Sequence, residues 1–240
     1  MFAALLGIGI GFSLAIQTAI NSQLRKFVIS PFLASMVSFL IGTVFLAIIT
    51  IISGSPLGIP LSLISSQPIW IWFGGFCGVI ALTTNILLFP KLGSVETSVM
   101  PIIGMIMMGM LIDNFGWFNS IEKSFGISRI LGVFLLLLGV VLAVVVPEVK
   151  ANRHNPAKTK QNQVNRWTWR MIGIGAGMFM SIQAAINGKL GVVLDSPFHA
   201  AFVSFFIGSV TLMILVGLKE RSFTNIKEPI KQSAPWWVWL

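Results

Sequence analysis

The sequence predicts an all-α integral membrane protein with an inverted five-plus-five helix repeat, in which the second repeat is truncated. Composition, the lengths of the apolar runs and an internal repeat predict this fold. Hydrophobic residues make up 55% of the chain and charged residues 10%, whereas an ordinary soluble domain carries about a quarter charged residues. The net charge of +9 does not indicate nucleic-acid binding, because the basic residues fall between the apolar runs rather than along one face. We therefore expect lipid to surround most of the chain.

Seven apolar segments are long enough to cross a bilayer as helices. A spanning helix needs about 20 apolar residues to cross roughly 30 Å of hydrocarbon. The start of the chain has neither a basic flank nor a cleavage site, so it predicts a membrane helix rather than a signal peptide. The segments lie near residues 2–22, 31–53, 69–89, 96–114, 127–147, 169–190 and 198–218, and an eighth begins at Pro235 and stops at Leu240.

The connections between these segments divide the chain into two parts. Gly, Pro and Asn at 53–56, 90–93 and 114–116 predict turns. Residues 148–166 are polar and basic, which predicts a cytoplasmic linker. The predicted domains are a first five-helix repeat at 1–147 and the start of an incomplete second repeat at 167–240.

The positions of Lys and Arg predict the orientation in the membrane. With the N-terminus outside, 13 basic residues face the cytoplasm and three face the outside. Cytoplasmic loops of membrane proteins carry the excess of Lys and Arg. The sequence therefore predicts an N-terminus on the outer side of the membrane, opposite the cytoplasm.

The internal repeat pairs the start of the chain with its last third. A shift of 166 residues aligns residues 7–48 with 173–214 without a gap, and 22 of these 42 positions are identical. With one inserted residue, 68–72 also pairs with 235–239. Five predicted helices separate the two starts, so the second repeat enters the membrane in the opposite direction. Inverted repeats are typical of secondary transporters, whose two halves expose one central site alternately to each side.

Polar side chains at helical spacing indicate a cavity for a solute. In the first and sixth predicted helices they recur every four residues, so they share one helix face. Amides both donate and accept hydrogen bonds, which suits a polar solute. The same amides also serve helix packing in membrane proteins, and this alternative stays open. The candidates for lining the cavity are Ser13, Gln17, Asn21, Thr84, Asn85, Gln183 and Asn187.

Ionisable and nucleophilic residues give little sign of other chemistry. Glu96 and Asp113 lie near the ends of the fourth segment, where either could couple transport to protons at a cavity mouth. Cys77, His154 and His199 do not have the spacing of metal ligands or of a catalytic triad. No ATP-binding loop of the G-x-x-x-x-G-K-[ST] type occurs in the sequence. We therefore expect neither an enzyme nor a bound metal or cofactor.

Several motifs together resemble the YdcZ-type inner-membrane exporters of the drug/metabolite transporter superfamily. They are the glycine-rich start, Gln-x-x-x-Asn, Ser-Pro-Phe-x-Ala, the Gly-Gly of the third segment, and Ile-Asp-Asn-Phe-Gly at 112–116. The resemblance covers nearly the whole chain and implies a ten-helix, five-plus-five protein in the bacterial plasma membrane. The sequence departs from the resemblance at Met105, where similar sequences tend to have Gln.

Two functions follow from these observations as hypotheses. The first is a secondary transporter, by resemblance an exporter, that moves a small metabolite or an amphipathic drug by alternating access around a midplane cavity. The alternative is a non-transporting membrane scaffold or assembly subunit, in which the amides only pack helices. The expected partners are the lipid bilayer and a small-molecule substrate, with a homodimer or a partner half as an option for the incomplete second repeat.

Overall fold

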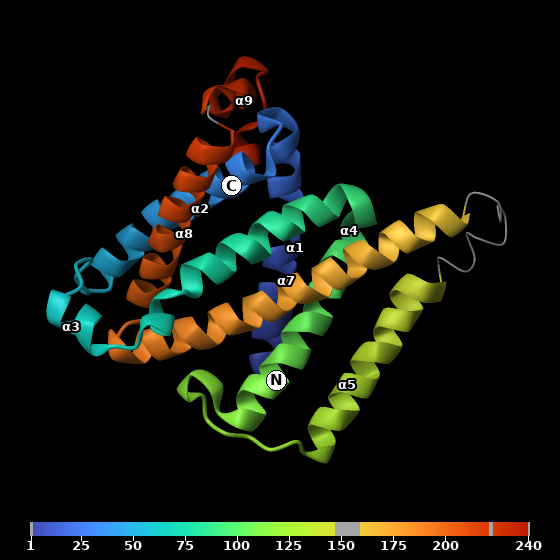
Figure 1. The fold of residues 1–240 in the computed structure, drawn as a ribbon, viewed down its shortest axis with the longest axis horizontal. Helices are drawn as coiled ribbons and strands as arrows, with labels where there is room; N and C mark the ends of the chain where they lie inside the picture. The colour runs from blue at the N-terminus through green and yellow to red at the C-terminus, as the bar shows by residue number, and fades with distance from the viewer. Residues whose placement is uncertain (1, 147–158, 221–222, 240) are drawn as a thin grey trace.

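The computed structural model describes residues 2–146, 159–220 and 223–239, and every regular element in these ranges is helical (Figure 1). This confirms the all-α prediction. The long helices are α1 (Phe2–Val28), α2 (Pro31–Ile52), α4 (Gly74–Phe115), α5 (Ile127–Val140), α7 (Thr159–Val193) and α8 (Pro197–Lys219). The short elements are α3 (Leu61–Ser66), α9 (Glu228–Lys231), the 3-10 turns η1 (Ile69–Trp72), η2 (Trp117–Asn119), η4 (Thr224–Lys227) and η5 (Trp236–Trp239), and the π-helical turn η3 (Val141–Val145).

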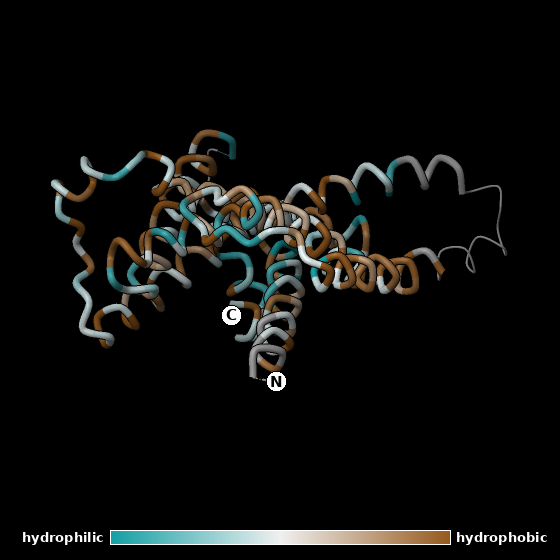
Figure 2. Tube along the Cα trace, turned by 90° about the horizontal axis from the view of Figure 1, so that it is seen from below, coloured by the Kyte–Doolittle hydropathy of each residue, from teal (hydrophilic) through white to brown (hydrophobic). Residues whose placement is uncertain are grey.

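Within these described ranges, five helices are long and apolar enough to cross a membrane: α2, α4, α5, α7 and α8. Helix α5 is the clearest case, because hydrophobic residues run all along it (Figure 2) and its large side chains are exposed. An apolar surface exposed on nearly all sides suits contact with lipid.

Helices α2 and α8 begin in the same way. The hydroxyl of Ser30 accepts hydrogen bonds from the backbone N–H groups of Phe32 and Leu33, and Ser196 accepts one from His199 N–H. In both helices Pro follows the serine, where its missing N–H costs nothing. The repeated Ser-Pro pair therefore fixes where each helix begins.

Helix α4 contains the two helices predicted at 69–89 and 96–114, although the first of them begins later than predicted. The label α4 covers 42 residues, but the two helices meet at Gly93, whose φ of 78° and ψ of 178° are not helical. This conformation is open to glycine but strained for other residues. Residues 69–72 form the separate turn η1 after Pro68, so the helix begins at Gly74. The break predicted at 90–93 is thus a sharp kink at Gly93, which divides α4 into a first arm (74–92) and a second arm (94–115).

Helix α7 runs beside the first arm of α4 and crosses the second arm (Figure 1). At the second arm the backbones nearly touch, because a Cβ on Gly104 would collide with the carbonyl of Ile174, and a Cβ on Gly177 with the carbonyl of Pro101. The hydroxyl of Ser181 also donates to the Met105 carbonyl at 2.7 Å. Small residues allow such close helix crossings in membrane proteins.

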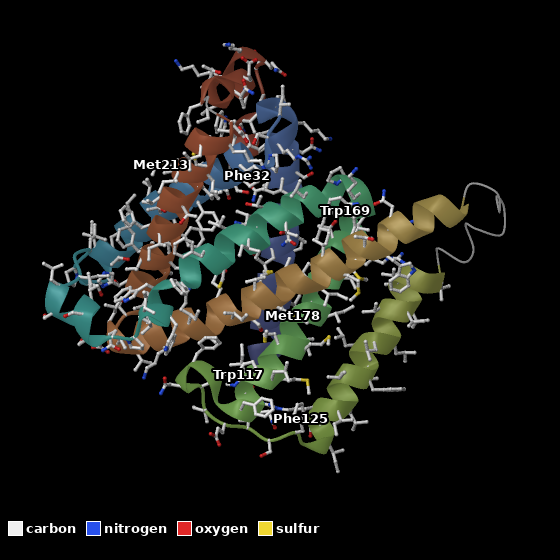
Figure 3. The ribbon with its side chains drawn as sticks, in the orientation of Figure 1. Phe32, Trp117, Phe125, Trp169, Met178 and Met213 are labelled. Carbon is white, nitrogen blue, oxygen red and sulfur yellow. The ribbon has the colours of Figure 1, made fainter. Side chains whose placement is uncertain are left out.

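Near the bend of α4, side chains extend this contact. Figure 3 shows Trp169 of α7 beside the bend, and the ammonium of Lys91 lies 5.8 Å from the centre of its ring. Trp169 also packs against the cluster of Leu88, Leu92 and Met100, which joins the two arms. The bend is therefore covered by α7.

Helices α2 and α8 lie side by side (Figure 1). The rings of Phe39 and Phe205 are 4.9 Å apart between their centres. A Cβ on Gly42 would lie 2.5 Å from Cε1 of Phe205, and a Cβ on Gly208 would collide with the ring of Phe39. Each ring thus occupies the space that a glycine leaves on the opposite helix.

The predicted linker at 148–166 is described only in part. Residues 148–158 lie outside the described residues, and 159–166 belong to α7, which begins at Thr159. At the other end of the second repeat, the predicted eighth segment is the turn η5 in the part that the structure describes. Its counterpart in the first repeat, η1, is also a 3-10 turn.

Candidate solute cavity

A cavity of about 410 Å³ lies among α1, α2, α4, α7 and α8. Helix α4 contributes residues from both arms, so the bend at Gly93 brings distant parts of one helix to the same space. Cavities of about 300 to 1,000 Å³ hold small molecules in other proteins. The polar side chains facing it include Gln17, Thr18, Asn85, Thr97, Ser98 and Gln183.

Three of the predicted site residues line this cavity: Gln17, Asn85 and Gln183. The amide of Gln183 lies over Gly78 of the first arm, where a Cβ would come within 2.8 Å of its Nε2. Asn85 is 9% exposed. Among the described residues its Oδ1 has no hydrogen-bond partner. The structure therefore brings together amides from α1, α4 and α7.

The other predicted residues lie elsewhere. Ser13 donates its hydroxyl to the Gly9 carbonyl of its own helix at 2.9 Å. Asn21 is 2% exposed in the helix core, and Thr84 is half-buried in α4. The Oδ1 of Asn187 lies against Gly74. These four are not among the residues that line the cavity, and the position of Asn187 fits the packing role that the sequence left open.

The cavity also contains residues that the sequence analysis missed. Thr97 follows the bend of α4, is 1% exposed, and its hydroxyl has no hydrogen-bond partner in the described part of the chain. Phe39 and Phe205 form an apolar wall from α2 and α8. A signal for the rings was available, because the two phenylalanines are identical positions of the internal repeat.

The two carboxylates expected near a cavity mouth are both paired. Glu96 accepts from Arg170 through both oxygens, at 2.7 and 3.0 Å, and from Arg166 at 2.5 Å. Asp113 accepts from Arg129 at 2.8 Å near the surface. Neither carboxylate lines the cavity, although Glu96 is next to Thr97, which does. Proton coupling by either group stays a prediction.

No Asp, Glu, Lys, Arg or His occurs among the described residues that line the cavity. Nor do the described ranges contain a group of three or more His, Cys, Asp or Glu residues placed to hold a metal ion. The arrangement offers neutral donors and acceptors beside apolar walls. Such a surface can bind a solute through hydrogen bonds and apolar contact.

One family model matches the chain, over residues 2–142 and 168–240, and it is described as "Putative inner membrane exporter, YdcZ". No curated protein and no solved structure matches it. The matched stretches contain every residue named above as lining the cavity. A transporter family implies a role other than catalysis, and the inner membrane of its description agrees with the apolar helices. The chain therefore belongs to the DMT_YdcZ family of multi-pass inner-membrane proteins.

Proposed function

We propose that the protein is a secondary transporter that exports a small metabolite or an amphipathic drug by alternating access. Two inverted repeats would rock against each other and open the cavity to one side of the membrane at a time. The observation that carries this proposal is that repeat-equivalent residues face the same cavity. Three pairs related by the shift of 166 residues line it: Leu14 with Met180, Gln17 with Gln183, and Phe39 with Phe205.

Contacts between α2 and α8 support a two-fold axis beside the cavity. Thr43 and Ser209 are equivalent positions of the repeat, and their hydroxyl oxygens are 2.9 Å apart. Residues related by a two-fold axis can touch each other only near that axis. The rings of Phe39 and Phe205, which are also equivalent positions, meet the same condition. We therefore place the axis of the proposed inverted repeat between these two helices.

The turns η1 and η5 support the same symmetry. Each packs against the first two helices of the other repeat, and the residues it meets there are equivalent under the repeat. Around η1 the buried cluster is Ile71, Leu190, Ala200 and Val203. Around η5 the buried cluster includes Val238, Leu24, Ala34 and Val37.

An N-terminus on the outer side of the membrane, opposite the cytoplasm, is part of the proposal. The end of α1, which carries Arg25 and Lys26, lies at the same end of the molecule as η4 and α9 (Figure 1), which contact α1. These short elements add Lys227 and Lys231. The gathering of basic residues at one end supports a cytoplasmic position for that end.

Distances between spin labels test the rocking of the two repeats. One label pair, at Lys26 and Met171, spans the repeats at the proposed cytoplasmic end, and a second, at Ile52 and Val192, spans them at the opposite end. All four side chains are exposed. A pair within α8, at Phe198 and Leu218, is the control because both labels sit on one helix.

For a transporter in lipid nanodiscs we expect two distance populations at each end, such that conditions that lengthen one pair shorten the other. The control pair keeps one distance. A single distance at both ends under every condition would favour the scaffold alternative, in which amides such as Asn187 only pack.

A further inference from the structure

Building on the proposed transport function, we infer that the cavity selects uncharged amphipathic solutes, which combine an apolar ring with a neutral hydrogen-bonding group such as a carboxamide. The inference rests on the unpartnered polar atoms of the cavity, on the charge of its lining, and on its aromatic wall. Each of these constrains a different part of the solute.

Two buried polar atoms at the cavity lack partners. They are Oδ1 of Asn85 and Oγ1 of Thr97, on residues that are 9% and 1% exposed. A buried polar atom without a hydrogen bond costs free energy, so native proteins satisfy nearly all of them. The amide oxygen accepts, whereas the hydroxyl can donate or accept. A carboxamide carries both kinds of group that these atoms lack, an N–H that the Asn85 oxygen can accept and a C=O to which the Thr97 hydroxyl can donate.

The charge of the lining argues against an ionic solute. A charged group leaving water for this cavity would meet no opposite charge among the described lining residues, and an unpaired buried ion is far costlier than a neutral polar group. Glu96 is the nearest acidic residue in sequence to Thr97, but Arg170 and Arg166 already bind its carboxylate. It is thus not free to act as the counter-ion of a cation.

The remaining wall is apolar and partly aromatic. The rings of Phe39 and Phe205 lie 4.9 Å apart at an angle of 34°, and Met105 and Met180 also face the cavity. Aromatic rings attract a further ring, and the flexible thioether of Met adapts to its outline. The volume of about 410 Å³ accommodates a small bicyclic molecule.

Three probes of nearly the same shape test the inference. They are 2-naphthamide, which is neutral, 2-naphthamidine, a cation, and 2-naphthoate, an anion. Binding of each to the whole chain in nanodiscs is measured by equilibrium dialysis, with empty nanodiscs subtracted to remove partition into lipid. We expect the neutral amide to bind at least about tenfold more tightly than either ion.

Single substitutions tie this preference to the unpartnered atoms. Thr97→Val keeps the shape of the side chain and removes the hydroxyl, so it should weaken binding of 2-naphthamide about five- to tenfold. It should also raise the melting temperature of the empty protein, because a buried hydroxyl without a partner is removed. Asn85→Leu should act in the same direction. The control, Thr211→Val, lies outside the cavity, and its hydroxyl donates to the Ile207 carbonyl at 2.8 Å, so binding should not change.

Three results would overturn the proposed solute class. They are tighter binding of either ion than of the amide, no binding of any probe, and binding of the amide that Thr97→Val does not weaken. The spin-label distances, measured on the same nanodisc sample, judge the transport function separately. If the solute class fails but each label pair shows two distance populations, the protein is a transporter of different selectivity. If each pair shows a single distance, the proposed transport function fails as well.

Discussion

Among single residues, Arg25 has a specific role near the bend of α4, where its side chain replaces a missing backbone N–H donor. Residue 90 would donate its N–H to the Ile86 carbonyl in a regular helix, but Pro90 has none. Nη1 of Arg25, from α1, donates to that carbonyl instead, at 3.0 Å. The guanidinium therefore joins α1 to α4 at the place where the helix loses its own bond.

This gives a prediction for Arg25. Arg25→Met should lower the free energy of unfolding by about 1.5 to 3 kcal/mol, the range for hydrogen bonds to charged groups. In a Pro90→Ala background the same substitution should cost less, because the backbone N–H restored by the alanine can donate to the Ile86 carbonyl. Unfolding in mixed micelles, followed by circular dichroism, measures both costs. Equal costs in the two backgrounds would mean that Arg25 acts through something other than this carbonyl.

Glu96 and Arg170 give a second prediction at the same scale. Their side chains are 8% and 3% exposed, so removing one partner leaves a buried charge. Glu96→Gln should therefore cost about 3 to 5 kcal/mol, whereas the double variant Glu96→Leu/Arg170→Leu should cost much less. The unfolding free energies of the single and double variants test this. A double variant as unstable as Glu96→Gln would show that the ion pair itself stabilises the fold.

At the level of whole helices, the packing of α7 against α4 can be tested with two glycines of α7, one in contact with α4 and one without contacts. A Cβ on Gly177 would collide with the Pro101 carbonyl, whereas a Cβ on Gly175 would meet nothing within 4 Å. Gly177→Ala should cost about 1 to 3 kcal/mol or more, because backbone cannot move aside. Gly175→Ala should be neutral or gain up to about 1 kcal/mol from helix propensity. Thermal unfolding of both variants in the same detergent measures this difference. Equal melting temperatures would contradict the close contact between Gly177 and Pro101.

The bend of α4 allows a test of backbone strain. Gly93 has φ of 78° and its Cβ position is open, so Gly93→Ala would add strain without a collision. We expect a loss of about 1 to 3 kcal/mol in the free energy of unfolding. Gly139→Ala, in α5 and equally free of contacts, is the control and should not destabilise. A stable Gly93→Ala protein would mean that the two arms can join through another conformation.

Sequence patterns predicted these elements unevenly, for physical reasons. The helix starts after Ser30 and Ser196 follow from local capping and were visible as the repeated Ser-Pro-Phe motif. Pro90 and Gly93 correctly predicted the break between the two arms of α4, but the same residues signal a kink as well as a loop, so the sequence did not show how short the break is. The Ile86 carbonyl receives its hydrogen bond from Arg25, which is 61 residues away in the sequence. A local sequence pattern cannot predict a contact between residues so far apart.

For the whole molecule, the internal repeat was the most informative feature of the sequence. It drew attention to Gln17 and Gln183, which the structure places at one cavity. Spacing alone also selected Ser13, whose hydroxyl bonds within its own helix. Thr97 was missed because it reaches the cavity only through the bend of α4 at Gly93 and the packing of α7 against α4, which no local sequence pattern shows. The repeat thus indicated polar candidates for the cavity, but tertiary contacts decided which of them line it.

Alternating access requires that one cavity between the repeats opens in turn to each side of the membrane. Cysteines at 17 and 183, in a Cys77→Ala background, can be tested with a membrane-impermeant thiol reagent applied from each side in turn. Asn21→Cys is the control, because Asn21 is buried away from the cavity. Both cavity positions should react from one side in one trapped conformation and from the other side in the opposite one, while position 21 stays protected. Protection of positions 17 and 183 from both sides would contradict alternating access and make these amides packing residues.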